Sequence, residues 1–153
     1  MQAGEETQVC ELIARVFQAF VASDLTPEGV QEFLKYVQPE SLLERSQVNH
    51  FVLVGVAQDQ IVGVIEVRGH QHVSLLFVDQ AYQGRGIAGD LWRRALDICR
   101  REKPGLAEVS VNSSPYALPI YEKLGFRPQG PEQIAHGIRF VPMAFDLLSS
   151  RRS

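Results

Sequence analysis

The sequence is poor in features that would each indicate a particular class of protein. It has two cysteines in 153 residues, Cys10 and Cys99, and both lie on the apolar face of a predicted helix. This favours a reduced, cytoplasmic protein over a disulfide-stabilised one. No apolar run approaches the ~20 residues of a membrane span. The first twenty residues carry three glutamates and no unbroken apolar run, so neither a signal peptide nor a membrane anchor is expected.

Net charge and metal-ligand patterns are also nearly absent. The 15 basic and 18 acidic side chains leave a formal charge of −3, which provides no field to attract phosphate backbones or anionic lipid. Binding to nucleic acid or to a membrane surface is therefore disfavoured. The four histidines are not grouped with carboxylates or thiols at ligand spacing, so no metal site is expected.

Apolar and aromatic side chains, in contrast, are plentiful. Hydrophobic residues make up 45% of the chain, with eight Phe, four Tyr and Trp92 among them. This is enough apolar surface to offset chain entropy through one buried core. We predict a single domain over residues 1–148, a polar tail over 149–153, and a monomer or homodimer.

The hydrophobic periodicity predicts a mixed α/β fold, with helices covering at least one face of a sheet. Thr26 followed by Pro27 predicts the start of the second helix. Runs of β-branched residues predict three strands in meander order. The expected order, ααβββαβαββ, comprises helices over 5–22 and 27–37, a further helical turn over 39–47, strands over 50–57, 61–67 and 72–78, a helix over 86–103, a strand over 107–112, a helix over 115–124 and two later strands.

The most informative segment joins the third predicted strand to the long helix. Residues 84, 86, 88 and 89 are all glycine or alanine. A helix begins with about four backbone N–H groups that lack intrahelical partners, and glycine lets an anion approach them closely. Such a turn can bind a pyrophosphate, with Arg85 adding charge, or it can be glycine-rich for conformational reasons alone.

Residues 83–88, Gln-Gly-Arg-Gly-Ile-Ala, resemble the Gln/Arg-x-x-Gly-x-Gly/Ala signature of the GNAT superfamily of acetyl-CoA-dependent N-acetyltransferases. Residues 76–79 resemble the end of its splayed strand. Residues 111–117 and 121–126 resemble the second half of its site. The resemblance covers residues 5–148 and suggests an unassigned bacterial-type member.

The resemblance implies a GNAT-like, mostly antiparallel twisted sheet. It is splayed at the family's fourth strand, and the family's first strand is short or absent here. It also implies acetyl-CoA as co-substrate. The family often has Asn seven residues before its tyrosine, where this chain has Ser114 and a nearby Asn112. The cofactor-binding residues implied are Leu76, Phe77, Val78, Gln83, Gly84, Arg85, Gly86, Ile87, Ala88, Gly89 and Asn112.

The activity implied is transfer of the acetyl group to a primary amine of a small molecule or protein, by direct attack in a ternary complex. Tyr121 matches the family's tyrosine and is the expected acid; a core role is the alternative. His72 is the expected base, with Glu66 as the alternative. A non-catalytic coenzyme A-binding sensor or interaction module of the same fold is the alternative function. Tyr36, Arg68 and Arg139 are candidates for selecting the acceptor, or ordinary surface residues.

Overall fold

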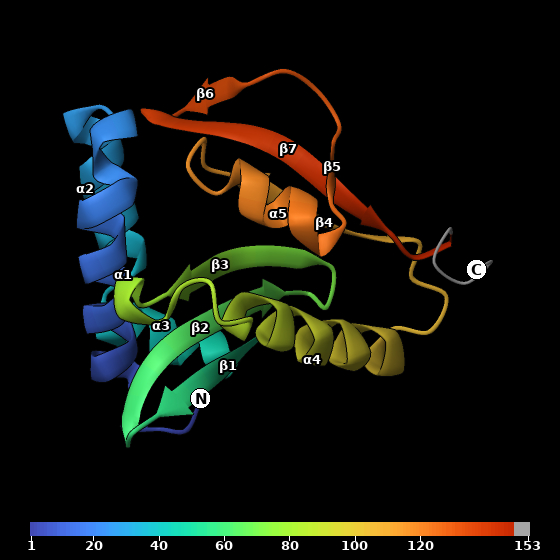
Figure 1. Ribbon diagram of the computed structural model, residues 1–153, viewed down its shortest axis with the longest axis horizontal. Helices are drawn as coiled ribbons and strands as arrows, with labels where there is room; N and C mark the ends of the chain where they lie inside the picture. The colour runs from blue at the N-terminus through green and yellow to red at the C-terminus, as the bar shows by residue number, and fades with distance from the viewer. Residues whose placement is uncertain (149–153) are drawn as a thin grey trace.

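The β-branched middle of the chain forms the predicted antiparallel meander (Figure 1). The computed structural model describes residues 1–148; the predicted tail at 149–153 lies outside this range. A seven-stranded sheet has the order β1-β2-β3-β4-β7-β5, and β6 pairs with β7. Its strands are β1 His50–Ala57, β2 Gln60–Arg68, β3 His72–Val78, β4 Glu108–Ser113, β5 Arg127–Pro128, β6 Gln133–Ala135 and β7 Ile138–Asp146.

The helices begin and end close to where the sequence pattern places them. Thr26 accepts a hydrogen bond from the Gly29 N–H at 3.1 Å, and Pro27 is the first helical residue, as predicted. The helices are α1 Glu6–Phe20, α2 Pro27–Tyr36, α3 Pro39–Ser46, α4 Ile87–Glu102 and α5 Leu118–Leu124, with short 3₁₀ turns at η1 Ala22–Asp24 and η2 Gln80–Tyr82.

The element order differs from the predicted one at both ends. Residues 39–46 form a full helix, α3, and three strands follow α5 instead of two. The first two of these strands have two and three residues, too few to show a period of two in the sequence. Residues 1–5 form no strand, so the family's first strand, which we expected to be short or absent in this chain, is absent from the described residues.

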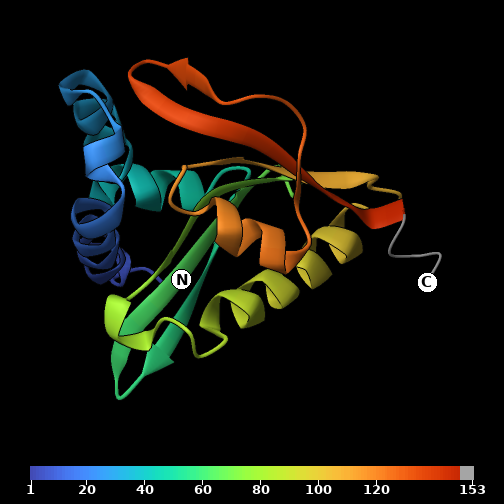
Figure 2. The same ribbon diagram turned by 45° about the horizontal axis from the view of Figure 1, so that its top comes forward.

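Helices cover both faces of the sheet; the sequence predicted that they cover at least one face. One core lies on the side of α4 and α5 and includes Trp92, Phe126 and Met143. The other lies on the side of α1 and α3 and includes Ile13 and Leu42. β2 is central to both and is buried from residue 61 to 67, which is why it reads as an unbroken apolar run apart from Glu66. Figure 2 shows α5 between the meander and β7.

β3 is irregular on both of its edges, and on one of them the sheet separates. β3 and β4 run parallel and pair at His72 with Ser110 and at Val73 with Val111; beyond these positions β3 continues without β4 beside it. On its other edge, Glu66 lies opposite Leu75 and Val67 opposite Val73, so Ser74 is an extra, bulged residue. A sheet that separates at a parallel pair leaves an open strand edge, and this edge forms one wall of a cleft.

Within residues 1–148, no helix combines the length and the apolar character needed to cross a bilayer. In the same range, no group of three or more His, Cys, Asp or Glu side chains is placed to hold a metal ion.

Candidate active site

A cleft of about 700 Å³ lies where β3 separates from β4. It has two halves, which we define by their residues and name after the roles that the sequence resemblance implies. The cofactor half is lined by Leu76, Phe77, Val78, Tyr82, Gln83, Gly84, Gly86, Ile87, Ala88, Asn112, Ser114, Tyr116, Ala117, Ile120, Tyr121 and Lys123. The acceptor half is lined by Val16, Phe17, Val21, Leu25, Glu32, Phe33, Tyr36, Ser74, Leu75, Ala135, His136, Ile138 and Arg139.

The glycine-rich turn has the geometry of an anion-binding helix start. Gly84 and Gly86 have φ of 79° and 82°, and a Cβ built on either would have open space around it. Backbone conformation, not crowding, therefore requires glycine at both positions. Asp90 donates the first intrahelical bond of α4, to Gly86 O at 3.0 Å. The N–H groups of residues 87–89 thus have no intrahelical acceptor, and the helix dipole adds positive potential beside them.

Gln83 connects the turn to both sides of the opened sheet. Its side-chain amide donates to Val78 O at 3.1 Å, and its carbonyl accepts from the Tyr116 hydroxyl at 3.2 Å. The Tyr116 ring also stacks on Phe20 of α1, with ring centroids 4.7 Å apart. These contacts fix the width of the cofactor half. Sequence reasoning missed Tyr116, because nothing in its local pattern indicates a partner 33 residues away.

Two predicted cofactor residues, Arg85 and Gly89, are not among the residues that line the cleft. The Arg85 guanidinium lies over the Tyr82 ring, 5.1 Å from its centroid. Gly89 belongs to the first turn of α4 and lies near Arg93. The other nine predicted residues line the cofactor half.

Tyr121 lines the same half from α5 and is 5% exposed. Its ring meets Phe126 edge-on, with centroids 5.4 Å apart, and Phe126 is fully buried against Trp92. Gly125, with φ of 107°, turns the chain between them. Glycine is also required there because a side chain would strike the Phe145 ring. Burial raises the pKa of Tyr121 well above its ordinary value, so the hydroxyl remains a proton donor at neutral pH.

His72, the expected base, is not among the cleft-lining residues. Its Nδ1 lies 2.7 Å from the Ser110 hydroxyl, across the parallel pair that closes the end of the cleft. Burial, together with the charge of Arg68, lowers the pKa of His72 to about 4. The imidazole is therefore neutral at pH 7 but weakly basic.

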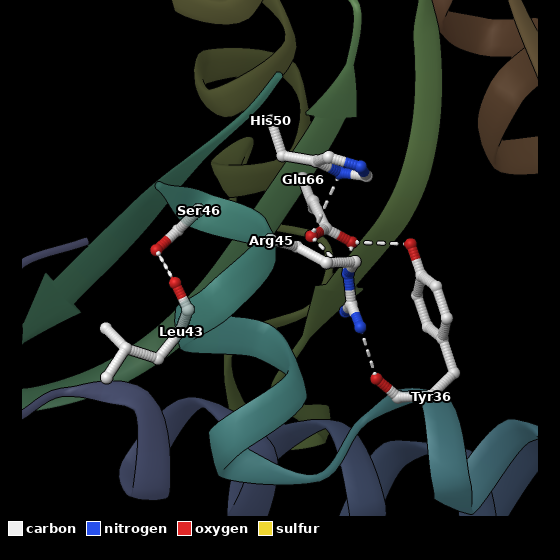
Figure 3. A network of polar contacts seen from close by, with 6 residues as sticks. All are labelled: Tyr36, Leu43, Arg45, Ser46, His50 and Glu66. Carbon is white, nitrogen blue, oxygen red and sulfur yellow. Dashed lines mark hydrogen bonds and ion pairs between the residues drawn. The ribbon is translucent and has the colours of Figure 1, made fainter. Parts of the chain in front are cut away.

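Glu66, the alternative base, is fully buried and also does not line the cleft. Its polar contacts are shown in Figure 3. Its carboxylate accepts from Arg45 Nε at 2.9 Å and from the Tyr36 hydroxyl at 3.0 Å. His50 Nδ1 lies 3.3 Å from the same carboxylate. Burial and the adjacent carboxylate raise the pKa of Tyr36. Glu66 thus reaches the cleft through Tyr36, a connection that no sequence spacing indicates.

The acceptor half is mainly apolar and is closed by contacts between distant segments. Phe33 stacks on Phe17 of α1 with centroids 4.1 Å apart, and it also meets Phe77 of β3. At its rim, Gly137 O accepts from the Thr26 N–H at 3.2 Å, which joins the start of α2 to the β6–β7 turn.

The sheet separates at a parallel pair, and the resulting cleft contains an amide-lined turn and a tyrosine. This is the arrangement of the acyltransferase class that the motifs predicted. The family described as the acetyltransferase (GNAT) domain matches residues 21–147. The chain belongs to this GNAT family of acetyltransferases.

Individual proteins are similar to this chain in sequence or in fold. The chain is 26% identical over 126 residues to the uncharacterized N-acetyltransferase YafP of Escherichia coli (strain K12), covering 82% of this chain and 77% of that protein. Its fold is similar to that of a GCN5-related N-acetyltransferase from Rhodopseudomonas palustris, at 16% identity and a TM-score of 0.81, over 96% and 92% of the two chains. It is also similar to the PaiA N-acetyltransferase of Thermoplasma acidophilum in complex with coenzyme A, at 18% identity and a TM-score of 0.79, over 95% of each chain.

Proposed function

We propose that the protein transfers the acetyl group of acetyl-CoA to a primary amine by direct attack in a ternary complex. The observation that carries this proposal is that one cleft contains the amide-lined turn, the open edge of β3 and the Tyr121 side chain. The bound coenzyme A of the PaiA structure supports the choice of cofactor.

In this proposal, the pyrophosphate of acetyl-CoA binds the free N–H groups at the start of α4, and Arg85 adds charge from outside the cleft wall. The pantetheine arm lies along residues 76–78 on the edge that faces β4, because β4 pairs with β3 only at residues 72 and 73 and leaves this edge open; β2 occupies the other edge. Asn112, Ser114 and Lys123 complete the opposite wall. The thioester is then held beside Tyr121 at the boundary between the two halves.

The chemistry requires an amine with a free lone pair and a stabilised thiolate. An alkylamine has a pKa of ~10.4, so holding it neutral at pH 7 costs roughly 4.6 kcal/mol. The apolar acceptor half disfavours the ammonium form and offsets part of this cost. The amine nitrogen attacks the thioester carbon, the C–S bond breaks, and Tyr121 donates its proton to the departing sulfur. The nitrogen loses one proton to the base or to water as the amide forms, and Tyr121 regains a proton from solvent.

Two side chains, His72 and Glu66, are the candidates for the base that accepts the amine proton. His72 is neutral at pH 7 but faces Ser110, so it would act through a water or not at all. Glu66 is hydrogen-bonded to a cleft residue, and its carboxylate is already bonded to Arg45. Both remain predictions, and the pH profile of activity in His72→Gln and Glu66→Gln variants separates them.

The test is release of free coenzyme A thiol from acetyl-CoA across a library of primary amines, with a thermal-shift titration alongside. Ligand at 100 times its dissociation constant adds about 2.7 kcal/mol of stability. We expect both a shift with acetyl-CoA and thiol release with some amines. A shift without turnover would favour the non-catalytic sensor instead, and no shift would exclude both functions.

A further inference from the structure

Tyr36 is the point where the acceptor half meets a buried charge. Its ring lines the cleft from the last turn of α2, and its hydroxyl lies 3.0 Å from Glu66 Oε1. Ser74, the bulged residue of β3, lines the same place and lies close enough to lower the pKa of Tyr36. In the proposed chemistry Glu66 is the alternative base, and Tyr36 and Ser74 have no role.

The buried carboxylate fixes the direction of the Tyr36 hydrogen bond. Both carboxylate oxygens of Glu66 accept from Arg45, at 2.9 and 3.3 Å, so they act as acceptors toward their other neighbours as well. Tyr36 therefore donates its one proton to Glu66. Its oxygen then offers lone pairs to a cleft ligand and has no proton left to give. A group at this position is favoured if it is a donor, such as an amine or ammonium N–H.

Arg45 also holds the Tyr36 side chain in place. Its guanidinium lies over the Tyr36 ring, 3.5 Å from the centroid, and it donates to the Tyr36 backbone carbonyl at 2.6 Å. Figure 3 shows Tyr36 and Arg45 pointing together at Glu66, from α2 and α3 respectively. With the guanidinium over one face of the ring and the hydroxyl bonded to Glu66, the hydroxyl is preorganised, so little side-chain entropy is lost when a ligand binds.

The charges around the acceptor half are unfavourable for a carboxylate. Glu32, one turn before Tyr36, lines the cleft and makes no ion pair or hydrogen bond with residues 1–148. Arg139 lines it as well, but Glu132 binds its guanidinium at 3.0 Å and Asp24 lies 3.7 Å away, so its charge is already matched. The remaining walls near Tyr36 are the apolar side chains of Phe17, Phe33 and Ile138.

From these contacts we infer that Tyr36 binds the amine nitrogen of the acceptor, and that the acceptor is an alkyl- or arylalkylamine with no carboxylate on its amine-bearing carbon. Glu66 and Arg45 act as positioning residues that orient the Tyr36 oxygen, and Glu32 repels acceptors that are α-amino acids. This inference rests on the proposed function and names the substrate class of its acceptor site.

The experiment compares 2-phenylethylamine with phenylalanine, which has the same side chain and an added carboxylate. We expect wild-type kcat/KM to favour 2-phenylethylamine by at least about tenfold. Loss of a hydrogen bond to a charged group corresponds to roughly 10- to 100-fold in binding, so Tyr36→Phe should raise the amine KM by that factor. Its dissociation constant for coenzyme A should not change, which also shows that the variant is folded.

Glu32→Gln should narrow the preference for 2-phenylethylamine over phenylalanine, whereas Glu28→Gln, an exposed glutamate of the same helix outside the cleft, should leave it intact. If the wild-type protein acetylates amines but uses 2-phenylethylamine and phenylalanine equally, this inference alone is overturned. The same holds if the wild-type protein acetylates amines and Tyr36→Phe leaves the amine KM unchanged. A wild type that acetylates no amine overturns the proposed function and the inference with it.

Discussion

At the scale of single residues, three titratable groups near the cleft behave differently because of what packs against them. Tyr121 has an apolar surrounding and keeps its proton. Glu66 is fully buried and paired with Arg45 at 2.9 Å. His72 is partly buried beside Arg68 and is held neutral. Residue type alone would have given Tyr121 and His72 ordinary pKa values.

Tyr121→Phe removes the proposed proton donor but keeps the ring that packs on Phe126. General-acid catalysis contributes typically 10²- to 10⁴-fold, so we expect kcat to fall by about 100-fold or more. The dissociation constant for coenzyme A should stay within about twofold, because the cofactor half is otherwise unchanged. A kcat equal to that of wild type would assign Tyr121 to the core alone.

The lowered pKa of His72 predicts a pH dependence of stability. The unfolded state binds this proton below pH about 6.5 and the folded state only below about 4, so the folded state is favoured above this window. The free energy of unfolding should fall as pH drops from 6.5 to 4, with a slope of at most about 1.4 kcal/mol per pH unit. Urea unfolding across this range should show a smaller slope for His72→Gln.

The same variant separates stability from catalysis. If His72 is the base, His72→Gln also removes a pKa from the activity profile; a change in stability alone makes His72 a structural residue of the parallel pair.

At the scale of elements, the turn at residues 83–88 combines two properties that glycine alone provides. Positive φ at Gly84 and Gly86 brings the chain from β3 into α4, and the missing side chains leave the amides open to the cleft. The sequence predicted the second property; the backbone angles show that the first is also required.

Gly86→Glu should weaken coenzyme A binding by about 100-fold or more, because a carboxylate would face the pyrophosphate. Gly105→Glu is the matched control, since Gly105 also has positive φ (85°) and open space around it but lies outside the cleft. Both variants should lose about 1 kcal/mol of stability from backbone strain. Equal coenzyme A affinity in the two, measured by calorimetry, would remove the anion site from the turn.

At the scale of the whole molecule, the acceptor half is made by segments that are far apart in the chain. The start of α2 and the β6–β7 turn approach so closely that neither Gly29 nor Gly137 has room for a side chain (Figure 1). A Cβ on Gly29 would lie 2.2 Å from Gly137 O. This contact sets how far α2, with Glu32 and Tyr36, stands from β7.

Gly29→Ala tests this contact, because helix propensity and tertiary packing predict opposite signs. Alanine in a helix is favoured over glycine by up to about 1 kcal/mol. The clash with Gly137 should outweigh this and lower the free energy of unfolding by roughly 1–3 kcal/mol. The amine KM should rise while coenzyme A affinity is kept. A more stable variant with unchanged amine KM would show that the two segments separate at little cost.

Much of the fold could be predicted from the sequence because it depends on local periodicity. The amphipathic α1 and α4, the Thr26 cap and the β1–β3 meander are each encoded within short stretches of chain. The sequence predicted two strands after α5 where the structure has three. β5 and β6 have only two and three residues, which carry no periodicity, and pairing with β7 holds them in place.

The candidate site divides in the same way. By itself, the sequence determined the family and the amide-lined turn, because the turn depends on glycines adjacent in the chain. Only the tertiary structure decided that Tyr36, Arg45 and Glu66 form one network, that His72 faces Ser110, and that the bulged Ser74 lines the acceptor half. Those relations are distances between residues on different elements, and packing and hydrogen bonding set them after the elements have formed.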